Sequence, residues 1–268
     1  MNDQIKPHSI RTRIWREEPE ADNPFAARAA YCHGYDVYGE MLGNTRWVEM
    51  LYLLFRHEAP STQQADMLEA LSVALANPGP RDASVHAAMC GGVCGSTAAS
   101  SLMAALAVGA GQYAGGHEVF RAMEAWTTCG TDLDAWRQEA AQSKGTSGSI
   151  WPASEHFQGF DPHGVSTATT VKQTLACLVG YGCGEHLSWL HRNLYAMEAI
   201  AGCPLALSGV TAAALFDLGF TPDQGEMLHL LLRLPGAAAH ALEQRPLGYK
   251  NFPFGTVELE DAPGKEAV

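Results

Sequence analysis

Residues 205–220 read LALSGVTAAALFDLGF, and residues 230–244 read LLLRLPGAAAHALEQ. Both stretches are rich in leucine, alanine and glycine and poor in charge. We expect this part of the chain to be helical, with a break between two of its helices at Gly219 and Pro222. Helices are predicted at about 207–218, 222–234 and 236–244.

Upstream, residues 45–58 read TRWVEMLYLLFRHE and place apolar side chains at helical spacing. Pro60 stops this helix because proline cannot continue the hydrogen-bond ladder, and Ser61 caps the next one. Two helices rich in Ala, Ser and Gly follow at about 83–94 and 98–110. Small side chains let helices approach closely, so we expect this pair to be central to the fold. The remaining helices are predicted at about 61–76, 116–128, 132–143, 165–181 and 185–201.

Two segments lack a helical pattern. Residues 1–27 carry mixed charges and prolines, and we expect an extended arm or capping segment outside the core. Residues 143–164, SKGTSGSIWPASEHFQGFDPHG, form a long irregular stretch, and a loop of this length is usually functional or disordered. Its aromatic residues Trp151, Phe157 and Phe160 favour an ordered loop. Beyond short edges, the sequence shows no convincing strand.

The formal net charge of the chain is −12. Nucleic-acid binding is therefore not expected, because phosphates require a basic surface. The N-terminus is polar and lacks a secretory signal pattern, and no unbroken apolar run is long enough to span a bilayer. We expect a cytoplasmic protein with no membrane span. Only 17% of residues are charged, which favours an oligomer.

The chain has seven cysteines, an odd number with no CxxC pair. Most lie beside Ala, Gly or Leu, so the pattern indicates buried apolar thiols in a reducing compartment. Cys90 and Cys94, in CGGVC, have surroundings too apolar for a metal site. No bound metal is expected.

Five segments in order resemble those of the citrate synthase and citryl-CoA lyase superfamily. Their order and spacing agree from about residue 30 to residue 245, which makes the set more specific than any one motif. The segments are HGYDVYGEML with WVEMLYLLFRHEAPS at 33–61, NPGPRDASVHAAM at 77–89, AGGHE at 114–118, IWPASEH with GFDPH at 150–163, and the stretch at 205–244.

The resemblance implies an all-α, citrate-synthase-like fold and a homodimer. A large helical domain would comprise residues 1–116 and 204–268, and a smaller helical domain, residues 117–203, would close over the substrate. The active site would lie in the cleft, where a carbon–carbon bond forms or breaks between an acyl-CoA and a keto acid. A CoA thioester would then be a substrate, with no tightly bound cofactor.

The resemblance makes His156 the general acid or base, since its spacing from Pro152 matches the family's Pro-x-x-x-His segment. Histidine suits this role because it titrates near neutrality; the alternative is a loop histidine in a structural hydrogen bond. Arg233, in RLPG, stands where the family holds a substrate carboxylate, with a buried ion pair as the alternative. The pocket would also contain Arg81, His86, His163 and His117, and CoA would contact Trp151, Pro152, Ala153 and Ser154.

Two of these histidines have a structural role as the alternative to a role in the pocket. His86 would be a hydrogen-bonded core histidine, and His117 would be an ordinary residue at a helix terminus. Other positions depart from the family pattern. Ser208 stands where the family usually has a catalytic aspartate, and serine cannot act as a carboxylate base at neutral pH unless it is activated. Ala114 and Pro78 replace histidines, and His163 replaces the arginine of a DPR motif.

These departures argue against ordinary citrate synthesis, because losing a catalytic carboxylate often costs several orders of magnitude in rate. One hypothesis is a carbon–carbon lyase or acyltransferase, citryl-CoA lyase-like, acting on a CoA thioester of a hydroxy or keto acid. His156 would work there with Ser208, a water or a substrate carboxylate. The alternative is a degenerate paralogue that binds an acyl-CoA-type ligand or a partner subunit without catalysis. The histidine kept in the loop favours the enzyme, and the loop aromatics suit a bulky or aromatic substrate.

Overall fold

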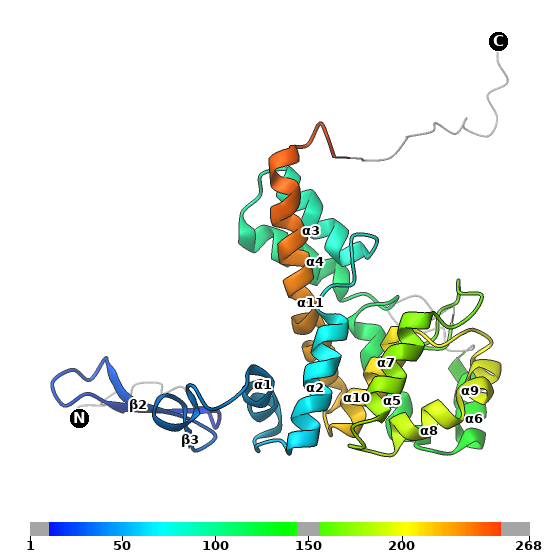
Figure 1. Ribbon diagram of the computed structural model, residues 1–268, viewed down its shortest axis with the longest axis horizontal. Coiled ribbons are helices and arrows are strands. Elements are labelled where there is room, and N and C mark those ends of the chain that lie inside the picture. The colour runs from blue at the N-terminus through cyan, green and yellow to red at the C-terminus, as the bar shows by residue number, and fades with distance from the viewer. Residues whose placement is uncertain (1–10, 144–155, 253–268) are drawn as a thin grey trace, which may run out of the picture. The chain divides into compact units, whose positions relative to one another are not determined.

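The computed structural model describes residues 11–143 and 156–252 of the 268-residue chain. Helices account for most of the described residues, and one small antiparallel sheet precedes them (Figure 1). The predicted helical class is confirmed. No helix in these two ranges is long and apolar enough to cross a membrane.

The chain forms two compact units. Unit 1 comprises Met1–Asn77 and Gly109–Arg233, and unit 2 comprises Pro78–Val108 and Leu234–Val268. These units are defined by contacts within one chain, whereas the predicted large and small domains refer to closure over a substrate. The predicted domain division therefore stays a prediction.

The sheet lies near the start of the chain. β1, Trp15–Pro19, pairs antiparallel with β2, Ala27–Cys32, and β2 pairs antiparallel with the two-residue β3, Tyr35–Asp36. His33 and Gly34 form the turn between β2 and β3, with φ of 47° and 94°. Two positive φ angles in a two-residue connection are what a hairpin turn of type I′ requires.

The expectation of no convincing strand was wrong for this segment. Arg28 forms an ion pair with Glu18 across β1 and β2 at 2.7 Å, and the guanidinium of Arg16 lies 4.1 Å from the centroid of the Tyr31 ring. Charged and aromatic cross-strand pairs thus contribute to this sheet. Such strands lack the alternation of apolar and polar residues that identifies a half-buried strand.

The first two helices follow the prediction closely. α1, Trp47–Arg56, ends at His57, and α2, Thr62–Leu75, begins after Ser61. The Ser61 hydroxyl accepts from the Gln64 N–H at 3.2 Å, and the Gln64 side chain accepts from the Ser61 N–H at 2.9 Å. This reciprocal pair is a capping box, which satisfies N–H groups that a helix start leaves without partners.

The other helices of unit 1 also lie close to the predicted positions, with two exceptions given below. They are α5, Gly116–Cys129; α6, Leu133–Ser143; α7, Thr169–Val179; α8, His186–Arg192; α9, Leu194–Ala201; α10, Leu207–Asp217; and the first part of α11, Pro222–Gln244. A short π-helix, Val37–Met41, lies where no helix was predicted.

The single helix predicted at 185–201 is broken at Asn193 into α8 and α9. Asn193 has φ of −105° and ψ of 14°, and its side chain donates to the carbonyl of Trp189 at 2.9 Å. An asparagine that bonds to the nearby backbone offers an alternative to the helical ladder.

The two helices predicted at 222–234 and 236–244 are one continuous helix, α11, with Pro235 inside it. Proline in a helix interior costs about 3 kcal/mol or more, because it removes one N–H donor. Leu232 and Ala237 are buried on either side of the proline, each in the core of its own unit. Their burial offsets that cost.

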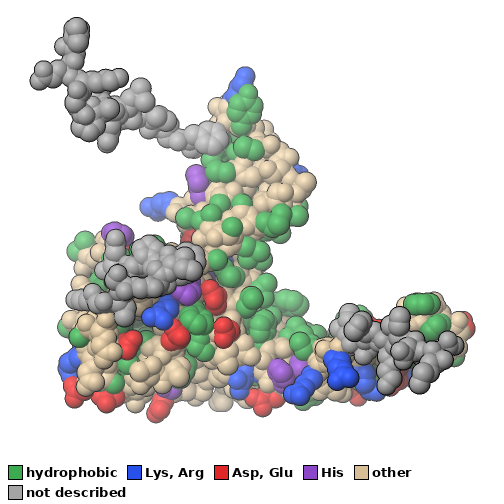
Figure 2. All heavy atoms as spheres, turned by 180° about the vertical axis from the view of Figure 1, so that it is seen from behind, with side chains coloured by type: hydrophobic (Ala, Val, Ile, Leu, Met, Phe, Trp, Pro, Cys, Tyr) green, Lys and Arg blue, Asp and Glu red, His purple; other side chains and the backbone are tan. Residues whose placement is uncertain are grey.

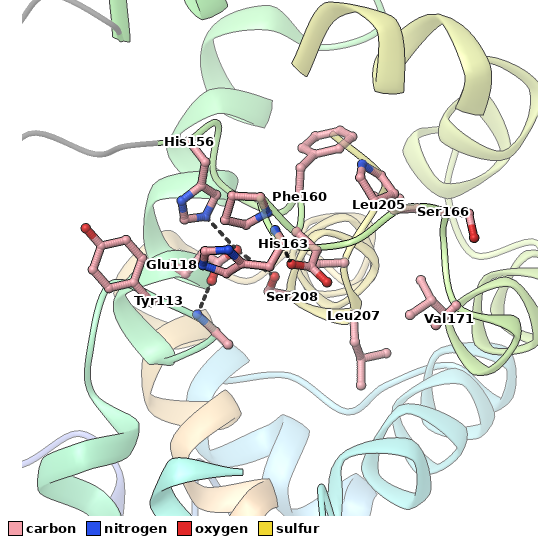
Figure 3. A pocket seen from close by; sticks show the side chains of 16 residues that line it. Tyr113, Glu118, His156, Phe160, His163, Ser166, Val171, Leu205, Leu207 and Ser208 are labelled. Atoms are coloured by element: carbon pink, nitrogen blue, oxygen red, sulfur yellow. Dashed lines mark hydrogen bonds and ion pairs between the residues drawn. The ribbon is translucent and has the colours of Figure 1, made fainter. Parts of the chain in front are cut away.

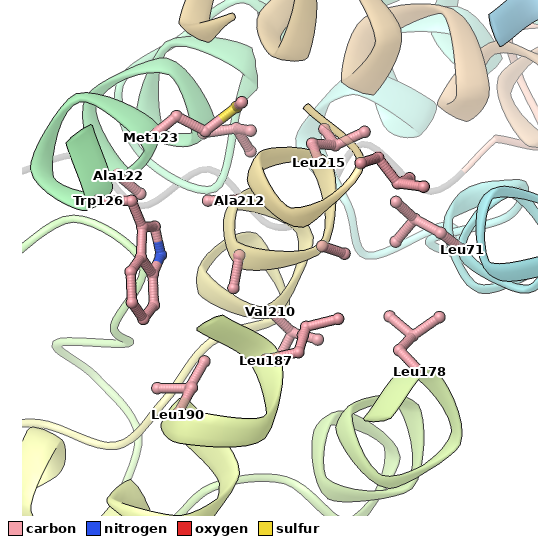
Figure 4. Packing of buried hydrophobic residues seen from close by; sticks show 14 of the residues in the cluster. Leu71, Ala122, Met123, Trp126, Leu178, Leu187, Leu190, Val210, Ala212 and Leu215 are labelled. Atoms are coloured by element: carbon pink, nitrogen blue, oxygen red, sulfur yellow. The ribbon is translucent and has the colours of Figure 1, made fainter. Parts of the chain in front are cut away.

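Helix α10 occupies the centre of unit 1. Every residue from Ser208 to Leu215 is buried. Four helices surround α10 and direct apolar side chains toward it (Figure 4). They are α2 with Leu71, α5 with Trp126, α7 with Leu178 and α8 with Leu187. A helix with apolar side chains all round is stable only when it is enclosed in this way.

Unit 2 contains α3, Ala83–Val93, most of α4, Ala98–Gly109, the end of α11, and a 3-10 turn, Arg245–Leu247. A Cβ at Gly92 of α3 would lie 2.0 Å from the carbonyl oxygen of Ala241 in α11, so only glycine permits this approach.

The predicted close packing of small residues is therefore present in unit 2. However, α3 and α4 form the smaller of the two cores, and the larger one is built around α10. Their small side chains bury less apolar surface than the leucines and aromatics around α10. Residues 83–108 contain no Asp, Glu, Lys or Arg, and over these helices Figure 2 shows mostly hydrophobic and uncharged side chains.

All seven cysteines are free thiols, but they are not all buried. Cys32 and Cys129 are buried, whereas Cys94 and Cys177 are exposed. The prediction of buried thiols was therefore wrong for Cys94, which caps the end of α3, and for Cys177, which lies on the outer face of α7. Val93 and Leu178, the valine and leucine beside these two cysteines, are buried on the same helices.

We expect Leu215→Ala to lower the free energy of unfolding by about 2–5 kcal/mol, because it removes apolar contacts and leaves a cavity beside α10. Leu215 is fully buried. The matched control is Leu231→Ala, since Leu231 is 44% exposed, and its expected loss is below about 1 kcal/mol. Urea unfolding measures both, and equal losses would contradict the central position of α10.

Burial, followed by the charges of Glu139 and Asp132, raises the pKa of the Cys129 thiol to about 11. The thiolate is the reactive form, so a raised pKa lowers reactivity at pH 8. We expect the thiol reagent DTNB to modify Cys94 and Cys177 in the folded protein and Cys129 only after unfolding. Peptide mass mapping identifies the sites, and rapid Cys129 modification in the folded state would contradict this assignment.

Candidate functional site

A cavity of about 330 Å³ opens within unit 1. Its wall comes from the start of α5, the loop between residue 156 and α7, and the start of α10 (Figure 3). The polar side chains of the wall are Tyr113, Glu118, His156, Asp161, His163, Ser166 and Ser208, and the larger apolar ones are Phe160, Val171, Leu205 and Leu207.

Glu118, in the first turn of α5, carries a buried carboxylate in this wall. Its side chain is 3% exposed. The N–H of Ala114 donates to Oε2, while the N–H of Gly159 and the hydroxyl of Ser208 donate to Oε1 at 3.0 and 2.8 Å. Three donors from three segments compensate for the water that this carboxylate loses on burial.

His156 lies next to this carboxylate. Its Nε2 is 3.7 Å from Glu118 Oε1, and its side chain is also 3% exposed. The ring of Tyr113 stacks on the imidazole with centroids 5.7 Å apart. An imidazole held between an aromatic ring and a carboxylate, at the wall of a cavity, is placed to exchange protons with a bound molecule.

The loop that carries His156 is tied to the segment before α10. The N–H of Ala206 donates to the carbonyl of Gly159 at 3.0 Å, and the N–H of Asp161 donates to the carbonyl of Pro204 at 2.8 Å. Phe157 and Phe160 of this loop are buried, whereas Trp151 lies outside the described residues, so the prediction of an ordered loop at 143–164 is tested only from residue 156 onward. The loop thus has a defined backbone on the wall of the cavity.

The structure brings three of the predicted site residues to the cavity: His156, Ser208 and His163. Ser208 is buried and donates to Glu118. His163 is exposed, and its N–H donates to the side chain of Asp161 at 2.9 Å. The roles predicted for these side chains stay predictions.

The other predicted residues lie elsewhere. Arg233 is buried, and its Nη1 donates to the carbonyl of Ala114 at 2.9 Å. Ala114 lines the cavity, whereas Arg233 itself does not. His117 Nδ1 lies 3.8 Å from Glu226 Oε1, next to the start of α5. Arg81 and His86 belong to unit 2. Trp151, Pro152, Ala153 and Ser154, predicted to contact CoA, lie outside the described residues.

His86 is exposed, so the alternative of a core position is wrong for it. Its ring lies beside the buried ring of Phe252, with the centroids 5.5 Å apart. Val85 and Ala88 are buried residues of α3, whereas His86 on the same helix is exposed.

Sequence reasoning did not single out Glu118, although it stands in the AGGHE segment. A signal was available in the helical periodicity of α5. Glu118 shares a face with Ala122, Ala125 and Cys129, all of which are buried. A carboxylate on the buried face of a helix needs buried partners, and this need points to a site.

The wall of the cavity carries acidic side chains without basic ones among its described residues. Among the described residues that line the cavity, Glu118 and Asp161 are acidic, and none is lysine or arginine. In the described part of the chain, no group of three or more His, Cys, Asp or Glu side chains is arranged to hold a metal. The chemistry available from these residues is proton transfer and hydrogen bonding.

The amino-acid sequence matches no family model and no curated protein. Solved structures share its fold. Citryl-CoA lyase from Hydrogenobacter thermophilus superposes with a TM-score of 0.72 at 19% identity, over 97% of this chain and 97% of that chain. ATP citrate lyase from Methanothrix soehngenii, solved with citrate and coenzyme A, has a TM-score of 0.73 at 15% identity, over 96% of this chain and 43% of that chain.

Citrate synthase from Thermoplasma acidophilum is also similar. It was solved with carboxymethyl coenzyme A and oxaloacetate, and it gives a TM-score of 0.60 at 16% identity. The match covers 84% of this chain and 59% of that chain. At these identities the likeness is one of fold, and it agrees with the resemblance that the sequence motifs indicated.

Gly209 of α10 allows the loop of His156 to approach. A Cβ at this position would lie 2.3 Å from the carbonyl oxygen of Gly159. We expect Gly209→Ala to displace the loop and weaken the bond from Gly159 to Glu118, at a cost of about 1–3 kcal/mol in unfolding free energy. The control is Gly180→Ala, at the exposed end of α7 where φ is −61°, with an expected change within about 0.5 kcal/mol. Denaturant unfolding compares the two, and an unchanged Gly209→Ala variant would contradict the close contact.

Proposed function

We propose that this chain, which has the fold of the citrate synthase and citryl-CoA lyase superfamily, forms or breaks a carbon–carbon bond in a CoA thioester of a hydroxy or keto acid. The observation that carries the proposal is the buried His156–Glu118 pair on the wall of a cavity of about 330 Å³. The solved proteins of this fold that were crystallised with coenzyme A, carboxymethyl coenzyme A, citrate or oxaloacetate support the same class of ligand.

The reaction requires proton transfer at two places. One proton moves at the α-carbon of the thioester, and another moves at the oxygen of the carbonyl or hydroxyl group on the second fragment. We assign to His156 the proton transfer at this oxygen, because an imidazole can both donate and accept a proton near neutral pH. Its Nε2 lies 3.7 Å from Glu118 Oε1, and its ring lines the cavity.

The lining of the cavity favours a substrate whose acyl group has few carboxylates. The described residues of the wall include two acidic side chains and no basic one, so a multiply charged anion would be repelled. Phe160, Val171 and Leu207 give the wall an apolar side. An apolar or aromatic acyl group fits such a wall better than citrate does.

A binding-only paralogue remains the second candidate, because Ser208 and Ala114 replace side chains that the resemblance makes catalytic. One observation favours the enzyme. Burying a carboxylate and an imidazole costs several kcal/mol unless both are compensated, and a chain that only binds a ligand has no need of that pair. Homodimer formation and a cytoplasmic location stay predictions, and the uncharged surface of α3 and α4 is suited to a subunit contact.

We expect His156→Asn to lower the rate at which 3-hydroxyacyl-CoA thioesters, citryl-CoA included, are cleaved into a shorter acyl-CoA and a carbonyl compound by about 10²–10⁴-fold, the usual contribution of a general acid or base. Mass spectrometry measures the shorter acyl-CoA product, and thermal unfolding checks that the variant is folded. The control is His191→Asn, which changes an exposed histidine of α8.

The outcomes separate the two candidates. A wild-type chain that CoA stabilises against heat, but that cleaves no acyl-CoA thioester at a carbon–carbon bond, supports the binding-only paralogue. A wild-type chain with neither stabilisation nor turnover contradicts both. Turnover that survives His156→Asn removes the role assigned to this histidine.

A further inference from the structure

Helix α10 lacks a carboxylate at Ser208, yet a carboxylate lies one hydrogen bond away on α5. We propose that Glu118 is the catalytic carboxylate of this site and exchanges a proton with the α-carbon of the thioester. The proposal rests on the proposed function and adds the residue that sequence reasoning left unassigned. It rests on the juxtaposition of Glu118, His156 and Ser208 at the cavity (Figure 3).

The carboxylate has room for a substrate. An ionised carboxylate offers about four acceptor positions, and three are taken by the backbone N–H groups of Ala114 and Gly159 and by the hydroxyl of Ser208. Glu118 itself lines the cavity. The remaining acceptor capacity is available to a C–H proton of a bound thioester.

The donors also fix the carboxylate in place. They come from the turn before α5, from the loop of His156 and from α10, so the orientation of Glu118 is set by three separate segments. A base that is already oriented needs no ordering when the substrate binds, which lowers the entropic part of the barrier. Ser208 is then a positioning residue, because it acts through Glu118.

Glu118 and His156 transfer protons at different atoms of the substrates. In the synthetic direction the Glu118 carboxylate takes a proton from the α-carbon of the acyl-CoA, and the C–H electron pair forms the enolate. The enolate carbon attacks the carbonyl carbon of the second substrate, so a carbon–carbon bond forms and the C=O π bond breaks. Protonated His156 gives its proton to the resulting alkoxide, which yields the hydroxyacyl-CoA.

The cycle closes between the same two residues. Glu118 now holds one proton and His156 has lost one, and their facing atoms are 3.7 Å apart. A small movement brings them within hydrogen-bond reach, so the proton returns from Glu118 to His156 without another group. Cleavage runs the same steps backwards, and the hydroxyl proton of the substrate ends on the α-carbon of the product.

The test follows deuterium entry at the α-carbon. Acetyl-CoA and propionyl-CoA are incubated in D₂O, each with and without oxaloacetate, and mass spectrometry measures exchange. We expect the wild-type chain to catalyse exchange and Glu118→Gln to lower its rate by at least about 100-fold. The control is Glu124→Gln, on the same helix, since the Glu124 side chain is 42% exposed and pairs with Arg121; it should leave exchange unchanged.

The results distinguish this inference from the proposed function. Exchange by a folded Glu118→Gln variant within about threefold of wild type overturns the role of Glu118 and leaves the proposed function standing. Carbon–carbon cleavage and exchange both absent in the wild-type chain overturn the proposed function itself.

A second measurement on the wild-type chain applies if Glu118→Gln does not fold. Bromoacetyl-CoA carries an electrophilic α-carbon, and a carboxylate beside that carbon displaces bromide to form an ester. We expect peptide mass mapping to find the adduct on Glu118 and excess acetyl-CoA to prevent it. An adduct on His156 in its place, or on neither residue, overturns the assignment.

Discussion

Helix α10 has no face toward water between Ser208 and Leu215, and it persists only because α2, α5, α7 and α8 enclose it. The same enclosure builds the site. The first turn of α10 presents a hydroxyl at Ser208 and a bare backbone at Gly209, and the loop of His156 packs against that bare backbone. The cavity wall is therefore a product of the core, and its geometry is as rigid as the core that supports it.

Much of the fold was accessible from the sequence wherever the deciding signals were local. Ser61 and Gln64 form the capping box that a serine before a helix predicts. The predictions failed where distant contacts decide. The sheet is stabilised by pairs such as Arg28 with Glu18, which have no apolar signature, and α11 passes through Pro235 because separate cores hold both of its halves.

The candidate site was predictable only in part, because some of its contacts join residues that are distant in sequence. His156 and Ser208 were found through the resemblance to citrate synthase-type segments, and both line the cavity. Glu118 was overlooked because an acid in the first turn of a helix is ordinary, being favoured there by the helix dipole. The periodicity of α5 places this acid on the buried face, but its partners Gly159 and Ser208 are far away in sequence and only the structure identifies them.

The composition of unit 2 has a consequence for synthesis on the ribosome. Its uncharged helices α3 and α4 pack on the end of α11 through contacts such as Gly92 with Ala241, but residues 109–233 separate the two parts in the chain. At about 5–20 residues per second, that interval takes roughly 6–25 s to translate. During this time the nascent helices expose small apolar faces with no charge to keep neighbouring chains apart. A trigger-factor-like holdase, or rapid completion of the chain, would matter more for this protein than for one whose early helices find their partners at once.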